Sequence, residues 1–388
     1  MEIYLVGGAV RDALLGLPVT DHDWVVVGAS AGELLELGYA PVGKDFPVFL
    51  HPVTHEEFAL ARTERKTAPG YRGFEVHASP EVTLEEDLAR RDLTINAIAV
   101  RAIPARLPGR FDLDFGHVVD PWGGRADLQA RLLRHVTESF REDPVRILRV
   151  ARFAARFPEF SVAPATLQLM RDMVAHGEAA HLVSERVWQE LARGLMAICP
   201  SRMFALLRSC GAEAWELGGY DFALERMPVI DLAASLGLAL PLRFACLCQR
   251  LPLARLRAFC EQLRVPLQCR ELAELALGEP DALQRSAGLD ATGLVQLLRR
   301  CDAFRRPGRF HDALQVWACD ALAGAGARPD PGPAQQWLAQ VLAAAQALDT
   351  RVVAEQARQV GAVGPQVGEM ILSARVAAVA ALVSPLSK

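Results

Sequence analysis

Two aspartates one residue apart, Asp21 and Asp23, are the side chains of this sequence best suited to hold metal ions. They open the run DHDWVVV, which we interpret as a strand over 21–27. Alternate residues of a strand share a face and lie roughly 6.6 Å apart along it. Both carboxylates can then hold one pair of divalent ions about 3.5–4 Å apart, and magnesium keeps coordination sites for phosphate oxygens. The spacing predicts a two-metal site, although such a pair alone is more often a solvated strand end.

A glycine pair, Gly7-Gly8, follows an expected buried strand over 2–6. Without Cβ atoms, the backbone N–H groups at this point can approach a phosphate closely. Arg11 follows within the next helical turn, where it can reach a phosphate oxygen. A glycine pair alone is usually a turn. The order strand, glycine pair, helix and acidic strand, however, indicates a site for a nucleoside triphosphate.

A second constellation is the segment RRDLTIN over 90–96. We expect Arg91 to bind the triphosphate. Asp92 and Asn96 are expected either to bind the ribose or to hold the arginine in place. The alternative is an ion-paired start of a helix that binds no ligand.

A third constellation lies over 142–156, where Pro144 suits the first turn of a helix and Asp143 its cap. Arginines recur along this helix at Arg146, Arg149, Arg152 and Arg156. A carboxylate can accept a hydrogen bond from the exocyclic amine of cytosine or adenine, which uracil and guanine replace with a carbonyl. Asp143 and Arg146 together therefore predict a preference for C and A, with a solvated arginine face as the alternative.

The composition indicates a globular protein of two or more domains, with 388 residues, 51% hydrophobic and 23% charged. A net charge of −4 gives no sign of nucleic-acid binding across the whole chain, so RNA contacts must depend on local arginine patches. The eight cysteines form no CxxC pair. We also expect no signal peptide, and an apolar tail over 374–383 that is too short to span a bilayer. These features predict a cytoplasmic protein without a membrane partner.

The strand and helix signals divide the chain into regions. Further strands are expected over 47–51, 56–61, 94–100 and 118–120, with an exposed loop over 62–80. From about residue 140 only helical spacing remains. The expected fold class is therefore an α/β head over 1–138, followed by all-α regions over 139–200 and 201–388.

Six motifs carry a resemblance to a known family: GGAVRD (7–12), DHD (21–23), RRDLTINA (90–97), DPWGG (120–124), EDPVRILRVARF (142–153) and SERVWQEL (184–191). In this order they resemble the motifs of the bacterial class II CCA-adding enzymes, tRNA nucleotidyltransferases of the DNA polymerase β superfamily. The resemblance is close over 1–200 and looser beyond. It implies a nucleotidyltransferase head, a helical neck that recognises the base, and a body and tail that bind the tRNA acceptor arm.

The resemblance also implies a reaction: template-independent addition of CCA to the 3′ end of tRNA from CTP and ATP, with two Mg²⁺ ions and release of pyrophosphate. The catalytic residues that it implies are Asp21, Asp23 and Glu64, of which Asp21 and Asp23 bind the metal. The nucleotide-binding residues that it implies are Gly8, Arg11, Arg91, Asp92, Asn96, Asp143, Arg146 and Arg149. The expected assembly is a monomer or a homodimer.

One region departs from the family pattern. Many relatives carry a metal-dependent HD phosphohydrolase domain, but here Gln249 and Arg250 stand where its histidine and aspartate would be. His311 is the only histidine after His181. We therefore expect a degenerate HD-like region without metal ligands or phosphohydrolase activity. The alternative functions are a poly(A) polymerase, a CC-only or A-only adding enzyme, and an inactive tRNA-binding protein.

Overall fold

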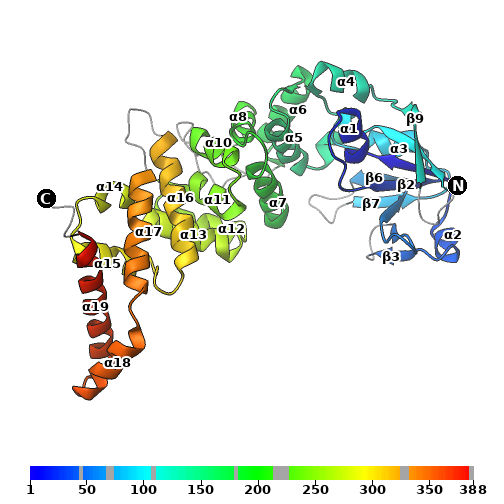
Figure 1. Cartoon of the computed structure of the whole chain (residues 1–388). Helices are drawn as coiled ribbons and strands as arrows, with labels where there is room; N and C mark the ends of the chain where they lie inside the picture. Colours follow the sequence, from blue (N-terminus) through cyan, green and yellow to red (C-terminus); the bar gives the residue numbers. More distant parts are fainter. Residues whose placement is uncertain are drawn as a thin grey trace. The chain divides into compact units, whose positions relative to one another are not determined.

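The computed structural model describes residues 1–42, 47–66, 74–105, 111–178, 182–212, 227–323 and 332–383 (Figure 1). The chain forms two compact units, Met1–Asp221 and Phe222–Lys388. The first unit combines β-sheets with helices, and every regular element described in the second unit is a helix. The expected fold class, an α/β head followed by helical regions, is confirmed.

The main sheet of the first unit has seven strands in the order β3-β4-β5-β2-β1-β8-β9. The strands are β1 (Glu2–Val6), β2 (Asp23–Val27), β3 (Ala40–Val42), β4 (Val48–Leu50), β5 (Glu57–Leu60), β8 (Ala99–Pro104) and β9 (Phe111–Val119). Neighbouring strands are antiparallel except β2 and β5, which are parallel. Two small sheets pair β6 (Arg62–Lys66) with β7 (Phe74–Ala78) and β10 (Leu132–Leu133) with β11 (Ser161–Val162).

The helices of the first unit are α1 (Gly8–Leu14), α2 (Ala31–Glu36), α3 (Leu84–Ala89), α4 (Gly124–Ala130), α5 (Val145–Arg156), α6 (Pro164–Ala175), α7 (Ser184–Leu195) and α8 (Ser201–Ser209), with short 3₁₀ helices η1 (Thr94–Asn96) and η2 (Glu138–Glu142). Capping boxes begin α2 and α3: in α3, Thr83 accepts from the N–H of Glu86, whose carboxylate accepts from the N–H of Thr83. This cap fixes the start of α3, which ends just before the arginines at 90 and 91.

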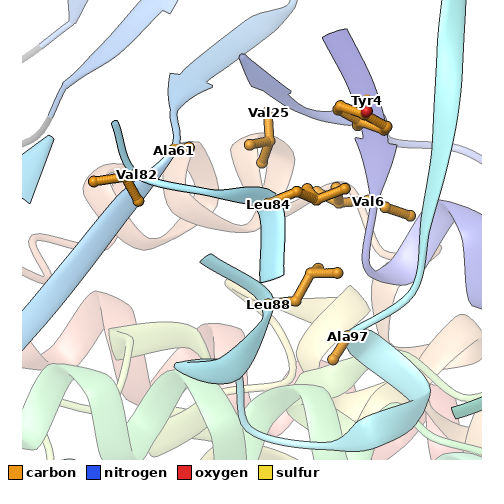
Figure 2. Close-up of a cluster of buried hydrophobic side chains, with 9 residues drawn as sticks. Tyr4, Val6, Val25, Ala61, Val82, Leu84, Leu88 and Ala97 are labelled. Atoms are coloured by element: carbon orange, nitrogen blue, oxygen red, sulfur yellow. The ribbon is translucent and has the colours of Figure 1, made fainter. Parts of the chain in front are cut away.

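A hydrophobic cluster covers one face of the main sheet (Figure 2). Tyr4 and Val6 of β1 lie on this face, and the strand register places Val25 opposite Tyr4 and Asp23 opposite Val6. Leu88 of α3, which is fully buried, belongs to the same cluster. Asp23 therefore projects to the face that α3 covers, at the end of its strand.

The strand predicted over 21–27 begins two residues later than expected. β1 ends at Val6, which is the partner of Asp23, so the antiparallel ladder offers no partner to Asp21. Asp21 lies in the segment before β2 and is exposed. The geometric argument that both aspartates share one strand face was therefore wrong for Asp21.

Two other predicted segments also differ from the structure. The loop predicted over 62–80 contains the antiparallel pair β6 and β7, and its middle, 67–73, lies outside the described residues. The strand predicted over 94–100 begins as the 3₁₀ helix η1. The reason is a tertiary contact: Thr94 donates to the carboxylate of Asp127 in α4 at 2.6 Å, and its N–H donates to the carbonyl of Arg134, which follows β10. These bonds hold the backbone away from the main sheet.

The second unit is built from α10 (Met227–Ser235), α11 (Leu240–Cys248), α12 (Leu253–Gln262), α13 (Leu267–Gly278), α14 (Ala282–Ser286), α15 (Ala291–Arg300), α16 (Pro307–Ala323), α17 (Gly332–Gln346), α18 (Thr350–Gln359) and α19 (Pro365–Val383) (Figure 1). By length and composition, α19 is the one described helix that could cross a membrane; the prediction considered only 374–383 and underestimated it. α19 packs against α15, α17 and α18, and its Arg375 lies 3.8 Å from the ring centroid of Phe304.

Candidate functional site

Gly7 makes the turn between β1 and α1. Its φ of 72° lies in the region that favours glycine. A Cβ at Gly7 would lie 2.9 Å from Nη1 of Arg91 and 3.9 Å from Oδ2 of Asp23. A Cβ at Gly8 would meet only the side chain of Arg11, at an ordinary 3.5 Å. The fold therefore requires glycine at Gly7, whereas the fold itself does not require it at Gly8.

The turn borders a cavity of about 580 Å³ in the first unit. Its charged and amide lining residues are Arg11, Asp23, Glu57, Arg62, Arg90, Arg91, Asp92, Asn96, Asp143, Arg146, Arg149, Arg152, Arg156 and Arg186. Nine arginines thus surround the cavity with four carboxylates. The structure brings together at this cavity all the predicted site residues except Asp21 and Glu64.

Asp23 and Glu57 form the acidic end of the cavity. β2 and β5 are parallel neighbours, and Trp24 lies opposite Phe58. Asp23 and Glu57 each precede that pair by one residue, so their side chains project to the same face. Among the described residues, no arginine or lysine forms an ion pair with either carboxylate. Glu57 was missed in the sequence because the pairing of β2 with β5 joins segments more than 30 residues apart.

Two predicted catalytic residues lie outside the cavity lining. Asp21 accepts a hydrogen bond from Oγ1 of Thr20 at 3.4 Å. Glu64, in β6, accepts from Nε of Arg62 at 3.0 Å and from Nη1 of Arg90 at 2.9 Å. Within the described residues there is no group of three or more acidic, histidine or cysteine side chains placed to hold a metal ion. Of the four carboxylates that line the cavity, those of Asp23 and Glu57 form no ion pair with an arginine or lysine among the described residues, whereas Asp92 and Asp143 do.

Asp92 is the buried centre of the site. Its Oδ2 accepts from Nε of Arg149 at 2.7 Å, and its Oδ1 accepts from Nδ2 of Asn96 at 3.0 Å and from the N–H of Leu93 at 2.9 Å. Burial by itself raises the pKa of this carboxyl. The charges of Arg149 and Arg146 and the hydrogen bonds outweigh burial and hold the pKa well below its usual range. Asp92 is therefore charged, and it raises the pKa of Arg149 in return.

Arg11 is buried in the same network. Its Nη1 donates to Oδ1 of Asn96 at 2.5 Å and its Nε donates to Oδ1 of Asp12 at 2.9 Å. Oδ2 of Asp12 accepts from Nη2 of Arg156 at 2.8 Å, and the Arg11 guanidinium lies 5.1 Å from the ring centroid of Phe153. Burial lowers the pKa of Arg11, and Asp12 opposes this change. We call the continuous series the buried network: Arg149, Asp92, Asn96, Arg11, Asp12 and Arg156.

The buried network bears on the roles predicted for Asp92 and Asn96. The arginine that they were expected to hold, Arg91, pairs instead with Asp87. Asp92 holds Arg149 and Asn96 holds Arg11. The network also links α1, the 92–96 segment and α5, which are far apart in the sequence.

Asp87 of α3, which the sequence reasoning missed, holds the two arginines of the RRD motif. Its Oδ1 accepts from Nη2 of Arg90 at 2.6 Å, and its Oδ2 accepts from Nη2 of Arg91 at 3.3 Å. Burial raises its pKa, but Arg90 and Arg91 more than offset this and the net pKa is lowered. The spacing of an acid with arginines three and four residues later was the available signal. The Nε–H of Arg91 has no hydrogen-bond partner among the described residues.

Asp143 and Arg146 both face the cavity from the start of α5. Arg186 of α7 donates to Asp143 through both terminal nitrogens, at 3.1 and 2.7 Å, and the N–H of Val145 adds a third hydrogen bond at 3.1 Å. Arg146 donates to the carbonyls of Ser139 at 2.8 Å and Arg90 at 2.6 Å. The base-reading pair predicted from the sequence is thus present at the cavity, with both side chains fixed by the protein.

We predict that Asp92→Asn lowers the free energy of unfolding of the first unit by about 3 kcal/mol at neutral pH. Removing one charge of a buried pair leaves the other uncompensated, and the partial exposure of Arg149 keeps the loss near the low end of the range. Because the folded pKa of Asp92 is depressed, its contribution is present above the ordinary value of 3.8 and is lost as the pH falls below it.

Denaturant unfolding of the wild type and the variant from neutral to acidic pH measures this difference, which should shrink below pH 3.8. Asp112→Asn, at an exposed position of β9, is the matched control and should change little. A difference that stays constant across the acidic range would contradict the prediction.

Comparisons with known proteins agree with this architecture. The family described as the poly A polymerase head domain matches residues 3–134. Among solved structures, a CCA-adding enzyme in apo form II has a TM-score of 0.70 at 20% identity over 97% of this chain and 88% of its own. The Thermotoga maritima CCA-adding enzyme complexed with tRNA has a TM-score of 0.64 at 19% identity over 97% and 86%. At these identities the structures show a shared fold.

Two curated relatives are far more similar in sequence. The multifunctional CCA protein of Variovorax paradoxus (strain S110) is 55% identical over 98% of this chain and 100% of its own length. That of Burkholderia mallei (strain SAVP1) is 52% identical over 92% and 93%. With this identity along nearly the whole length, the chain belongs to the family of multifunctional CCA proteins, the CCA-adding tRNA nucleotidyltransferases.

Proposed function

We propose that this enzyme adds and repairs the CCA end of tRNA from CTP and ATP at the cavity of the first unit, with release of pyrophosphate. The observation that carries the proposal is the combination of an acidic end and nine arginines around one cavity. Solved structures with the same fold include complexes of CCA-adding enzymes with ATP, CTP and tRNA. The head over 1–138 would catalyse transfer, the neck over 139–200 would recognise the base, and 201–388 would bind the tRNA acceptor arm.

The arginine-rich part of the cavity suits a triphosphate. Arg91 lies beside the Gly7 turn, and its Nε–H has no hydrogen-bond partner in the part of the chain that the structure describes, so it retains a donor for a phosphate oxygen. Gly8 begins α1 and leaves its backbone N–H unobstructed by a side chain. Arg11, in contrast, is buried and stabilises the cavity wall through its hydrogen bond to Asn96 in the buried network. Preorganised guanidinium groups stabilise the negative charge of the phosphates without having to rearrange during the reaction.

The acidic end suits divalent ions. Its carboxylates supply the hard oxygens that Mg²⁺ prefers, and neither is neutralised by an arginine or lysine among the described residues. Asp23 and Glu57 would hold the metal, with Asp21 as a further ligand from the exposed segment before β2. Two bound Mg²⁺ ions would supply activation of the RNA 3′-hydroxyl and charge neutralisation on the triphosphate. The chain itself positions the nucleotide and the RNA end next to these carboxylates.

Base recognition would come from Asp143 and Arg146. Among the described residues, Oδ2 of Asp143 accepts from Arg186 alone, so it can still accept from the exocyclic amine of C or A. The arginine fork and the N–H of Val145 prevent the carboxylate from turning away. A carbonyl of U or G facing this fixed carboxylate would leave both acceptors without a donor.

The protein is proposed to work in the cytoplasm, as expected for tRNA synthesis. None of the eight cysteines, all of which the structure describes, forms a disulfide, which agrees with a reducing compartment. Poly(A) polymerase is the second candidate because the matching head family carries that description.

An incorporation assay tests the function. Purified protein with tRNA lacking CCA should add CMP from CTP alone and complete CCA when both nucleotides are present. Asp23→Ala should abolish incorporation while retaining tRNA binding, because the lost carboxylate holds metal rather than RNA. Extension beyond three nucleotides with ATP alone would instead favour poly(A) polymerase.

Glu57 and Glu64 are the two candidates for the third catalytic carboxylate, and mutation can distinguish them. Glu64 was predicted from the sequence, but it pairs with Arg62 and Arg90, whereas Glu57 faces the cavity. We expect Glu57→Gln to lower kcat about 100-fold or more, and Glu64→Gln to lower it much less. Raised Mg²⁺ should partly rescue Glu57→Gln alone. A larger defect in Glu64→Gln would reverse the assignment.

Asp143→Ala should raise the incorporation of UMP and GMP relative to CMP and AMP by about 5- to 150-fold, the range of one lost base contact. Single-turnover incorporation of each nucleotide measures the ratio. Glu138→Ala removes a nearby exposed carboxylate of η2 and is the control. Loss of all four incorporations in equal proportion would show that Asp143 supports the fold and does not read the base.

We also propose that the enzyme lacks the phosphohydrolase activity of an HD domain. Gln249 is buried, and Arg250 donates to Oδ2 of Asp320 at 3.3 Å. A positively charged guanidinium therefore occupies the position where an HD domain has its metal-binding aspartate. His311 is exposed and bonds to the carbonyl of Pro307. Pure protein with Mg²⁺, Mn²⁺ or Ni²⁺ should release no phosphate from 2′-phosphate or 2′,3′-cyclic substrates. Metal-dependent release would refute this.

A further inference from the structure

A second groove, of about 400 Å³, lies beside the nucleotide cavity in the first unit. It is lined by Arg152, Arg156, Arg193, Met196, Ala197 and Ile198. Arg152 and Arg156 line both the groove and the cavity. We call it the neck groove, and these shared arginines place it directly beside the cavity.

Two helices build the neck groove. Arg152 and Arg156 are one turn apart on α5, and Arg193 lies in the last turn of α7. The chain then leaves α7 through residues 196–198. The N–H of Cys199 donates to the carbonyl of Ala155 at 3.0 Å, which holds this segment against α5.

Acidic side chains hold two of the three arginines of the neck groove in place. Nε of Arg152 donates to Oε2 of Glu190, and the guanidinium lies 4.3 Å from the ring centroid of Phe153. Arg156 is held by Asp12. Arg193 approaches Glu190 only to 3.8 Å, and its side chain is 63% exposed. Arg193 is therefore the groove arginine that is best placed to meet an anion from solvent.

Large apolar side chains lie beside these cations. Ile198 is 71% exposed and Met196 is 45% exposed. A surface of cations with adjacent exposed apolar side chains suits a nucleotide whose phosphate and base face are both accessible. In a duplex the base faces are covered by stacking on neighbouring bases. Only a single strand therefore offers a phosphate and a base face together.

We propose that the neck groove binds the single-stranded 3′ end of the RNA substrate, just upstream of the nucleotide being extended. The phosphates lie on the groove arginines and a base face packs against Ile198 and Met196. Because Arg152 and Arg156 line both hollows, a strand that crosses these two arginines would end at the cavity. The proposal rests on the proposed function, since it names where the RNA of that reaction lies.

Binding measurements with two RNA hairpins test the proposal. One hairpin mimics an acceptor stem with a short 3′ overhang, and the other is the same stem with a blunt end. Arg193→Ala should raise Kd for the overhang hairpin about threefold to tenfold and reduce the slope of log K against log salt by about 0.7, the value for one single-strand phosphate. Ile198→Ser should raise the same Kd without changing the slope. Neither variant should change Kd for the blunt hairpin.

Arg125→Ala, at an exposed arginine of α4 that does not line the groove, is the matched control and should bind both hairpins as the wild type does. Equal weakening of both hairpins by Arg193→Ala would overturn the single-strand assignment, and no weakening of either would overturn the groove as an RNA site. Incorporation by the wild type is measured separately. If the wild type incorporates CMP but Arg193→Ala binds the overhang hairpin normally, the proposed function stands and only the proposed role of the neck groove is refuted.

Discussion

The site depends on one electrostatic constraint: many guanidinium groups surround a single cavity, and buried carboxylates must hold them apart and in place. Asp92 meets this need at the centre, because it joins Arg149 to Asn96 and through it to Arg11. Asp12 continues the series to Arg156. Cations that are paired on their buried side keep a fixed position for a ligand on the open side. The same contacts tie α1 to α5, so the fold of the first unit and the shape of the cavity have a common cause.

Local sequence spacing predicted the parts of this site that belong to single segments. The glycine turn, the RRD motif and the start of α5 each place their residues at the cavity, as expected from helix and strand periodicity. The α/β head and the helical remainder were also evident, because alternating strand signals end near residue 140. Where the prediction failed locally, a tertiary partner was decisive: Thr94 is tied to Asp127, which turns an expected strand into a 3₁₀ helix.

Long-range partners could not be predicted in the same way. Glu57 reaches the cavity only because β5 pairs in parallel with β2, and no local pattern at 57 distinguishes it from Glu64. The same holds for Arg186, whose fork on Asp143 joins residues 43 apart. Asp21 shows the opposite case: its spacing from Asp23 suggested a shared strand, but the ladder ends where β1 ends. Spacing identifies residue types suited to a chemistry, whereas strand register and helix packing decide which of them meet.

Selection of the incoming base without a template requires a protein group whose position does not adapt to the base. Asp143 satisfies this requirement in the proposed function, because three N–H donors of Arg186 and Val145 define the direction of its carboxylate. A mobile carboxylate could turn toward solvent when a carbonyl approached, and the penalty against U and G would disappear. Arg186 would therefore contribute to specificity without touching the base, in the same way that Asp92 supports Arg149. In both places an ion-pair partner turns a flexible charged side chain into a fixed one.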